Sequence, residues 1–444
     1  MKTPLIFILV LLFFSMGCQA QSPDLSEDDL PLYEHLKSIA HSGEKEELLM
    51  KIKDQVGDRK LVLLGESTHG TREYYRNRYL ISRMLIEEKG FDFIGVEGDW
   101  SSIFTLNQYV KNLPGAPESA RAAMKKFNRW PEWMWANTEV EEMIEWLRSH
   151  NDPLPADEKV GFYGIDIYGQ WDALDGLMKL ISETDWSDKD QLTGKISCFK
   201  DFHGNEWDYA TQVAQGRIQP CGDDLKQLLD LLKPRLKEME DDYTAIRMLQ
   251  KTHVLIRAED HFRLSPINRV DSWNTRVDHF WKTSERLLQF YGSDSRGVVW
   301  AHNTHVGDAE ATVMSTQGQR NIGKISRQKL GPQNVYILGF GTYKGRVNAG
   351  RSWGEPMQIM DIPPAIENSY ENILNEIPGE DYILFFSSEE REATPLLSAR
   401  GNRAIGVTYD PANERGNYVP TLIAHRYDAF WFITVTNPLE VIGN

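Results

Sequence analysis

Carboxylate and imidazole side chains stand at the ends of several short apolar runs in this sequence. The residues in question are Glu66, His69, Glu97, Asp166, His302 and His305. Any one of them has an ordinary explanation, because an acidic residue after a strand often caps the next helix. Their recurrence is more informative, since parallel strands bring their carboxyl ends to one edge of a sheet, where ligands bind. We therefore expect these side chains to converge on one site.

A histidine that lies beside carboxylates can activate water. Neutral imidazole accepts a proton near pH 7, and an adjacent carboxylate orients the ring and favours the imidazolium that forms. His69, in the turn GESTHG at 65–70, is the candidate base. The candidate carboxylates are Glu66 of the same turn and Glu97 of the apolar run at 93–99. Ser67 is a poor candidate nucleophile, because the turn lacks the final Gly of G-x-S-x-G. The turn also lacks the Gly-Lys-Ser/Thr sequence of a phosphate-binding loop.

The segment AHNTH at 301–305 places His302 and His305 three residues apart. The two imidazoles could hydrogen-bond the carbonyl oxygen or the leaving group of a substrate as charge develops. They could instead join His69 and one of the glutamates around a divalent cation that activates water. A third interpretation is that one histidine bonds locally while the other is exposed. The spacing leaves all three open.

The elements that must position these residues are predicted to form an α/β fold, with a mainly parallel sheet flanked by helices. Runs that are apolar at both alternate positions are typical of strands covered on both faces. Such runs occur at 61–66, 93–99, 160–166, 297–303, 334–341, 382–388, 403–410 and 427–436. Residues 72–90 carry a helical pattern that ends at Gly90, which predicts a strand-helix-strand unit.

One domain is expected over residues 21–444. Its stretches 101–155 and 170–290 carry helical patterns with few strand signals. We predict that these stretches are helical insertions that form a lid over the carboxyl edge of the sheet.

Residues 1–20 have the pattern of a signal peptide, since Lys2 precedes an apolar run that is too short to span a bilayer. Ser-Met-Gly-Cys resembles a bacterial lipobox, which would leave a lipidated Cys18 at the mature N-terminus. Ordinary cleavage before Gln21 is the alternative. We therefore expect an exported protein, either periplasmic or a membrane-anchored bacterial lipoprotein. In that setting Cys198 and Cys221 are expected to form a disulfide.

The charge balance excludes some partners. The chain has 65 acidic and 49 basic residues, a formal net charge of −16. Such a surface repels nucleic acid and anionic lipid. Membrane contact is therefore expected only through the N-terminal lipid anchor, and the expected partner is a small molecule.

Several blocks of the sequence together resemble the erythromycin esterase family. They are GESTHG (65–70), GVEGDW (95–100), RWPEWMWANTEVEEMIEWLRSHN (129–151), GFYGIDIYG (161–169), SWNTRVDHF (272–280), WAHNTHVGD (300–308) and YDAFWFITVTNPL (427–439). The resemblance implies a hydrolase domain that cleaves an ester or macrolactone with activated water. It also implies no covalent intermediate, no required metal and no cofactor. The resistance enzymes of that family inactivate macrolide antibiotics.

The resemblance assigns roles to residues of this chain. His69 matches the general base, and Glu66, Glu97, His302 and His305 match the other motif positions. An Arg early in the following helix serves the family's site, and Arg78 is the match, with Arg72 or Arg76 as alternatives. We expect His302, His305 and Arg78 to bind the carbonyl oxygen or protonate the leaving alcohol. The residues expected to line the substrate cleft are Tyr75, Trp133, Trp135, Asp166, Tyr168 and Arg276.

One block departs from the family pattern. Relatives usually have Arg-Asp after the Ser-Trp-Asn stretch, whereas this chain has Arg276-Val277 and then Asp278. A shift of one residue turns a helical side chain by about 100°. The departure therefore concerns substrate range more than chemistry.

Two other classes of function remain open at this point. A divalent-metal-dependent hydrolase or peptidase would use the same His and Glu cluster. In a non-catalytic surface lipoprotein, His69, Glu97 and His302 would not converge.

Overall fold

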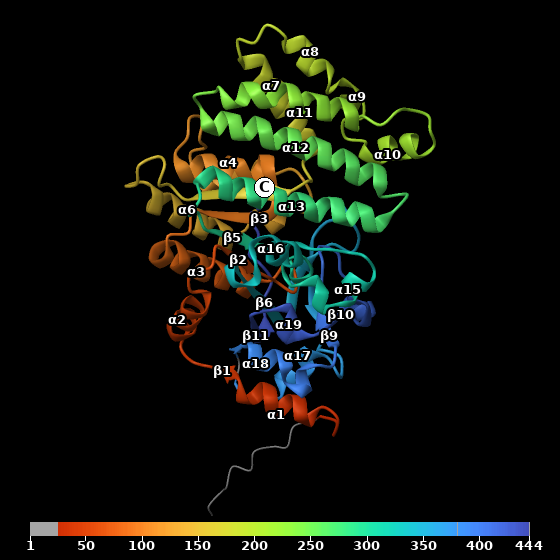
Figure 1. Ribbon diagram of the computed structural model, residues 1–444. Coiled ribbons are helices and arrows are strands. Elements are labelled where there is room, and N and C mark those ends of the chain that lie inside the picture. The colour runs from red at the N-terminus through yellow and green to blue at the C-terminus, as the bar shows by residue number, and fades with distance from the viewer. Residues whose placement is uncertain (1–24, 380, 444) are drawn as a thin grey trace, which may run out of the picture.

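The parallel sheet predicted from the apolar runs lies at the centre of the molecule (Figure 1). The computed structural model describes residues 25–379 and 381–443, so the predicted signal peptide and Cys18 lie outside the described residues. The strands of the main sheet are β1 (Ala40–His41), β2 (Leu61–Leu64), β3 (Phe93–Asp99), β4 (Gly161–Asp166), β5 (Gly297–Trp300), β6 (Val335–Ala349), β7 (Gln358–Ile362), β8 (Asp381–Phe385) and β11 (Ala429–Thr436). Their order is β1-β8-β11-β6-β2-β5-β3-β4, with β7 paired to β6. Neighbours from β11 to β4 are parallel, whereas β1, β7 and β8 pair antiparallel.

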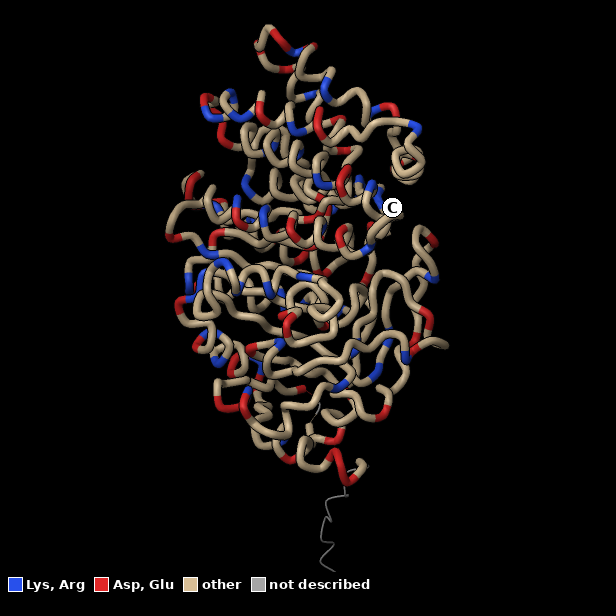
Figure 2. The backbone as a smooth tube through the Cα atoms, turned by 45° about the vertical axis from the view of Figure 1, so that its right-hand side comes forward, with Lys and Arg blue, Asp and Glu red and all other residues tan. Residues whose placement is uncertain are grey.

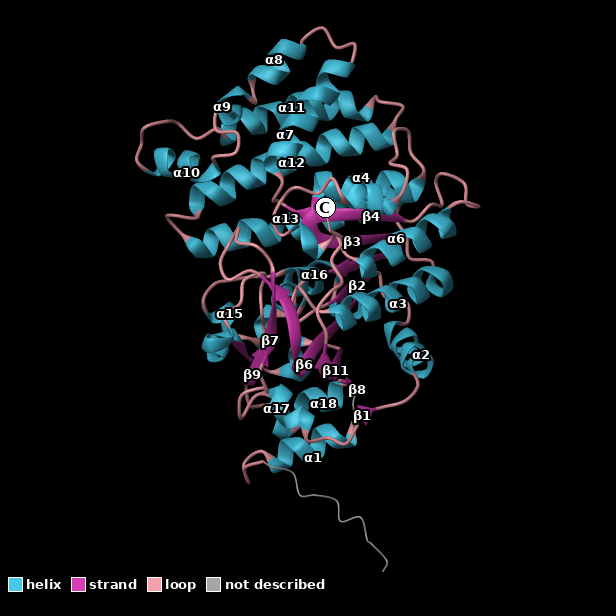
Figure 3. Ribbon diagram, turned by 180° about the vertical axis from the view of Figure 1, so that it is seen from behind, coloured by secondary structure: helices cyan, strands magenta, loops and turns pink. Residues whose placement is uncertain are grey.

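Helices cover both faces of this sheet and extend past one of its edges (Figures 1 and 3). The α-helices are α1 (Leu30–Ser38), α2 (Lys45–Val56), α3 (Arg72–Lys89), α4 (Trp100–Lys111), α5 (Ala120–Met124), α6 (Thr138–Asn151), α7 (Gln170–Glu183), α8 (Lys189–Gly194), α9 (Ser197–Lys200), α10 (Glu206–Ala214), α11 (Gly222–Lys237), α12 (Asp242–Leu264), α13 (Arg269–Tyr291), α14 (Asn303–Val306), α15 (Val313–Thr316), α16 (Ile322–Leu330), α17 (Tyr370–Asn375), α18 (Ser388–Glu392) and α19 (Ile423–Arg426). The short 3-10 helices are η1 (Glu132–Met134), η2 (Ala309–Ala311), η3 (Pro332–Asn334), η4 (Thr394–Leu396) and η5 (Pro411–Asn417).

The two faces of the sheet pack into two hydrophobic cores. Along β2, Val62 and Leu64 pack into the core that includes side chains of α2, α3 and α6. Leu61 and Leu63 point the other way, into the core that includes side chains of α1, α13 and α17. All four side chains are fully buried. This explains why the run is apolar at every position, and the predicted fold class is confirmed.

The turn between β2 and α3 is held in place by two glycines. A Cβ atom at Gly65 would lie 2.1 Å from the side-chain oxygen of Asn303, and one at Gly70 would lie 2.1 Å from the carbonyl oxygen of Asn348. Both positions therefore require glycine for close approach rather than for turn flexibility. The helix predicted over 72–90 is confirmed as α3, and Gly90 ends it in the left-handed conformation, at φ 66°.

The strand predicted at 403–410 is wrong. A two-stranded sheet of β9 (Arg400–Arg403) and β10 (Tyr418–Thr421) ends where that strand was expected to begin. Ile405 instead donates its backbone N–H to the carbonyl oxygen of Ser67, 2.8 Å away. This segment therefore forms a loop whose apolar residues pack against the turn that follows β2.

The helical stretch at 170–290 forms a layer beyond the edge strand β4 (Figure 3). Leu177 of α7, Leu228 of α11 and Leu255 of α12 share a separate hydrophobic core. Cys198 and Cys221 are joined as a disulfide in this layer, with Cα atoms 5.9 Å apart. The chain leaves the sheet at its edge strand, β4, so these helices lie beyond the sheet. They bury their apolar side chains mainly against one another. Of the two predicted insertions, the one at 101–155 reaches the carboxyl edge of the sheet through Arg129 and Trp135, and the one at 170–290 reaches it through Arg276 of α13.

Charged residues of both signs are interspersed over the body (Figure 2). Within residues 25–379 and 381–443, the longest apolar stretches in helices fall short of what a membrane crossing needs.

Candidate active site

The carboxyl ends of β2, β5, β3 and β4 lie side by side, and the predicted residues meet there. These strands are consecutive neighbours in the sheet and all run parallel. A cavity of about 400 Å³ opens at this edge. Among the predicted residues, those that line it are His69, Glu97, Trp135, Asp166, Tyr168, Arg276, His302 and His305. The predicted convergence is therefore present.

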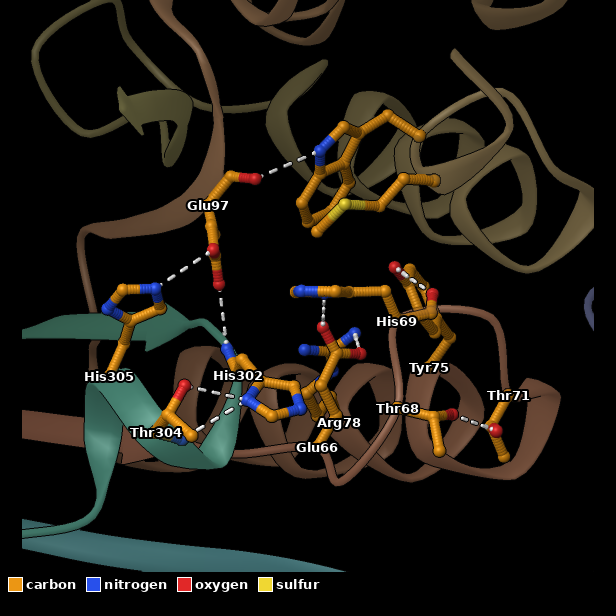
Figure 4. A network of polar contacts seen from close by, with 12 residues as sticks. Glu66, Thr68, His69, Thr71, Tyr75, Arg78, Glu97, His302, Thr304 and His305 are labelled. Atoms are coloured by element: carbon orange, nitrogen blue, oxygen red, sulfur yellow. Dashed lines mark hydrogen bonds and ion pairs between the residues drawn. The ribbon is translucent and has the colours of Figure 1, made fainter. Parts of the chain in front are cut away.

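The buried carboxylate of Glu66 binds the His69 ring on the side away from the cavity. Its Nδ1 lies 2.9 Å from Oε1 of Glu66, and the hydroxyl of Tyr75 donates to its carbonyl oxygen at 3.0 Å. The other oxygen of Glu66 pairs with Nη2 of Arg78 at 2.8 Å, and both side chains of this pair are 0% exposed. Since Nδ1 is occupied by Glu66, Nε2 of His69 is the nitrogen left for the cavity. Figure 4 shows the ring directed toward Glu97.

Two carboxylates set the protonation of His69. Burial by itself lowers the pKa of the ring, but the charges of Glu97 and Glu66 outweigh burial and raise the pKa above 6.5, while Arg276 opposes them. The imidazolium form of His69 is therefore well stabilised in this site. That property suits a group that must take up a proton during a reaction.

Glu97 lies at the centre of the polar network. Its Oε1 accepts from Nη2 of Arg276 at 2.9 Å and lies 3.2 Å from Nε2 of His305. Its Oε2 accepts from the backbone N–H of His302 at 2.8 Å. Burial works to raise the pKa of Glu97, but the charges of His305, His69 and Arg276 hold it well below 4.5. Glu97 is therefore a fixed negative charge facing His69.

Arg276 is fixed by carboxylates from two strands. Its Nε and Nη2 donate to the two oxygens of Asp166 at 3.0 and 2.6 Å, in addition to the bond with Glu97. Asp278, the displaced acid, is turned away and accepts from Arg320 at 2.8 Å. Val277 is fully buried. Asp166 thus supplies the partner that Asp278 cannot reach.

His302 offers a neutral hydrogen-bond donor. Its Nδ1 accepts from the backbone N–H of Thr304 at 3.2 Å, so the ring proton belongs on Nε2. Nε2 is buried. Burial, and then the charge of His69, lower the pKa of His302 well below 6.5, although a backbone hydrogen bond with Ser67 works to raise the pKa of the ring. The centroids of the His302 and His69 rings are 4.9 Å apart.

His305 positions Glu97, and its Nδ1 is buried with no hydrogen-bond partner among the described residues. Its Nε2 is the nitrogen that faces Glu97, and its ring stacks on Trp273, with centroids 4.7 Å apart and planes inclined by 10°. Figure 4 shows its second nitrogen pointing away from His69.

Three predicted cavity residues lie elsewhere. Arg78 is fully buried behind Glu66, with its guanidinium 4.3 Å from the ring centroid of Tyr75. Tyr75 and Trp133 are each only 1% exposed and belong to the hydrophobic core. Arg78 and Tyr75 do share a face of α3, but that face supports His69 from behind. Arg78 therefore cannot bind a carbonyl oxygen or a leaving group in this arrangement.

The sequence interpretation missed part of the cavity wall. Arg129, Trp353 and the loop at 404–408 line it, and Arg129 lies 4.5 Å from the ring centroid of Tyr168. Arg129 begins one of the family-like blocks, which was the one available signal for it. Trp353 lies in a turn with no pattern around it.

The polar network around Glu97 also bears on the interpretation that these residues bind a divalent cation. Within the described ranges, no group of three or more His, Cys, Asp or Glu residues is arranged to hold a metal ion. Glu97 and Asp166 are instead bound to the guanidinium of Arg276. A permanent cation occupies the position between the two carboxylates.

Comparisons with known proteins bear on both the fold and the family. Three solved structures share the fold: a succinoglycan biosynthesis protein (18% identity, TM-score 0.74, 93% of this chain and 99% of that chain), a Bacillus cereus protein (18%, 0.76, 93% and 99%) and a mutant of the erythromycin esterase EreC in its open conformation (14%, 0.64, 87% and 93%). Among curated proteins, erythromycin esterase type II of Escherichia coli is 30% identical over 112 residues, which is 25% of this chain and only 24% of that relative. The family model for erythromycin esterase matches residues 86–436, a range that begins after the turn at 65–70. The chain therefore belongs to the erythromycin esterase family.

Proposed function

We propose that this protein hydrolyses a carboxylic ester, open-chain or macrolactone, with water activated by His69. One observation carries the proposal. The Nδ1 of His69 is bound by Glu66, while the ring is directed across the cavity toward the fixed charge of Glu97. A histidine oriented in this way removes a proton from water through Nε2.

The reaction needs no covalent enzyme intermediate. As the water oxygen attacks the carbonyl carbon, its proton passes to Nε2 of His69, and the resulting imidazolium is stabilised by Glu66 and Glu97. When the bond between the carbonyl carbon and the alkoxy oxygen breaks, the same proton passes to the departing alkoxide. The products are a carboxylic acid and an alcohol.

His302 is the candidate donor to the carbonyl oxygen. Its ring lines the cavity beside His69, and its lowered pKa keeps the ring neutral. A donor that is already oriented stabilises developing negative charge without reorganisation. This assignment separates the two histidines, with His69 as base and His302 as hydrogen-bond donor.

The first experiment compares His69→Ala with His203→Ala. His203 is an exposed histidine that pairs with Asp175 far along the chain from the network, so it is a matched control. Each variant is incubated with a panel of macrolactones and simple esters, and mass spectrometry detects the addition of one water. His69→Ala should lose at least about two orders of magnitude in rate, the usual contribution of a general base. Equal activity in His69→Ala and the parent would contradict the proposal, and loss of activity on chelation would redirect it to a metal-dependent hydrolase.

The name of one relative guides the choice of substrates for the panel. The Escherichia coli protein is named for erythromycin, a macrolactone, so macrolactones belong first in the panel. Inactivation of a macrolide antibiotic is the corresponding biological role that we propose to test.

A further inference from the structure

A second cavity, of about 530 Å³, lies directly beside the candidate active site. Tyr168 and Arg276 line both cavities. Trp207, from α10, and Trp273, from α13, form further walls of the second one. The two cavities therefore meet at Tyr168, whose ring is partly exposed. A ligand that crosses this ring occupies both.

Each cavity has a tryptophan at its wall that is more than half exposed. Trp353 is 58% exposed at the first cavity, and Trp207 is 57% exposed at the second. Tyr168 lies between them, with its ring centroid 5.9 Å from that of Trp353 and 6.3 Å from that of Phe262. Trp207 meets Phe262 edge-on at 5.3 Å. Exposed aromatic surface of this kind is typical of a binding site, because a ligand can bury it.

The chemistry of the second cavity differs from that of the first. None of the described residues that line it is acidic, whereas Glu97, Asp99, Glu132 and Asp166 line the first. Burial lowers the pKa of His261, so this imidazole is neutral. Arg276 is already neutralised by its two carboxylates. The second cavity therefore offers mainly aromatic surface together with the exposed guanidinium of Arg269, which suits a ring-bearing group that has no positive charge.

The wall of the second cavity is in contact with the catalytic network. Trp273 stacks on His305, and His305 faces Glu97. A group bound against Trp273 is thus separated from Glu97 by the indole of Trp273 and the imidazole of His305. This short path places both cavities within reach of one substrate molecule.

We propose that the substrate is an elongated ester that occupies both cavities. Its ester group lies at His69 in the first cavity, and a ring-bearing group on one side of the ester crosses Tyr168 and stacks on Trp207 in the second. This inference rests on the proposed function. It adds a specificity site that the catalytic residues do not define.

The kinetic test uses two esters with the same linkage. One is 3-phenylpropyl 4-phenylbutanoate, which carries a ring on each side, and the other is propyl butanoate. In Trp207→Ala, the ratio of kcat/KM for the large ester to that for the small ester should fall by about tenfold, and Trp207→Phe should restore it, because a stacked aromatic pair contributes up to about that factor. Trp186→Ala is the matched control. Trp186 lies in the same helical layer, packs near Arg235 and lines neither cavity.

A binding test keeps the inference independent of catalysis. The probe is 3-phenylpropyl 4-phenylbutyl ether, which cannot be hydrolysed, and its Kd is measured by calorimetry on the full chain. Wild type should bind it about tenfold more tightly than Trp207→Ala, and Trp186→Ala should match wild type. Equal Kd values in wild type and Trp207→Ala, no binding by wild type, or an equal loss in Trp186→Ala would each overturn the two-cavity site. If binding follows expectation while no ester is hydrolysed, the proposed function fails and the site stands.

Discussion

Replacing Arg78 by Met tests whether this arginine acts on substrate or only through Glu66. The two side chains are both 0% exposed and are joined at 2.8 Å. Removing one partner of a buried ion pair leaves the other charge unpaired, which costs about 3–5 kcal/mol. For a chain of 444 residues, the entropy of unfolding is about 0.9 kcal/mol/K, so the expected fall in Tm is about 3–5 °C.

A double variant and a matched control sharpen this prediction. In Arg78→Met with Glu66→Gln, neither buried charge remains, so the combined loss of stability should be smaller than the sum of the single losses by about 0.5–3 kcal/mol. Arg83→Met is the control on the same helix. Arg83 is 45% exposed and pairs with Glu87 one turn away, a contact worth at most about 0.5 kcal/mol. Its Tm should therefore change by less than about 1 °C.

The assays are differential scanning calorimetry and ester hydrolysis with separate kcat and KM. Arg78→Met should lower Tm and also lower kcat, because Glu66 loses the cation that fixes it behind His69. An unchanged Tm with a raised KM alone would mean that Arg78 contacts the substrate, and the reasoning from its burial would be refuted.

Two further predictions concern pH. The value of kcat/KM should fall as pH decreases through the raised pKa of His69, above 6.5, since only neutral imidazole takes up a proton. Glu97→Gln should move this limb of the pH profile to lower pH, because the Glu97 charge raises that pKa. A limb that stays in place would contradict the assignment. The free energy of unfolding should decrease as pH falls below 6.5, because burial lowers the pKa of His279 and His302 well below that value. The unfolded chain then binds protons that the folded protein does not. The loss of stability is about 1.4 kcal/mol per pH unit for each group. His69 contributes with the opposite sign, since its raised pKa gives stability that is complete below pH 6.5 and is lost as pH rises through the folded value. Urea unfolding at pH 7.5 and 5.5 measures the balance, and His279→Asn should show a smaller difference between the two pH values than the parent; identical differences would rule out this origin.

The strands and the convergence of the site could be predicted from the sequence because both follow from local pattern and topology. Runs such as that of β2 are apolar at every position, which only a sheet covered on both faces requires. Parallel pairing then brings the strand ends together without any knowledge of side-chain contacts. For this reason the sequence predicts that His69, Glu97, Asp166 and His302 lie at one edge of the sheet.

The direction in which each side chain points could not be predicted in the same way. The spacing of Tyr75 and Arg78 indicates a shared face of α3, but helical periodicity does not say whether that face meets a cavity or a core. The answer depends on Glu66, which lies on a different element and draws Arg78 inward. Trp353 and the loop at 404–408 are harder still, because they are brought to the cavity by loops whose course no periodic pattern specifies.

Arg276 explains how the site tolerates so much negative charge near a base. Glu97 and Glu66 raise the pKa of His69, and an imidazolium cannot accept a proton from water. Arg276 lowers the pKa of His69 while it anchors Glu97, so it limits the effect of the carboxylate that it positions. Asp166 in turn fixes Arg276 from the end of β4. The carboxylate that fixes Arg276 beside Glu97 thus comes from the end of β4, whereas Asp278 pairs with Arg320.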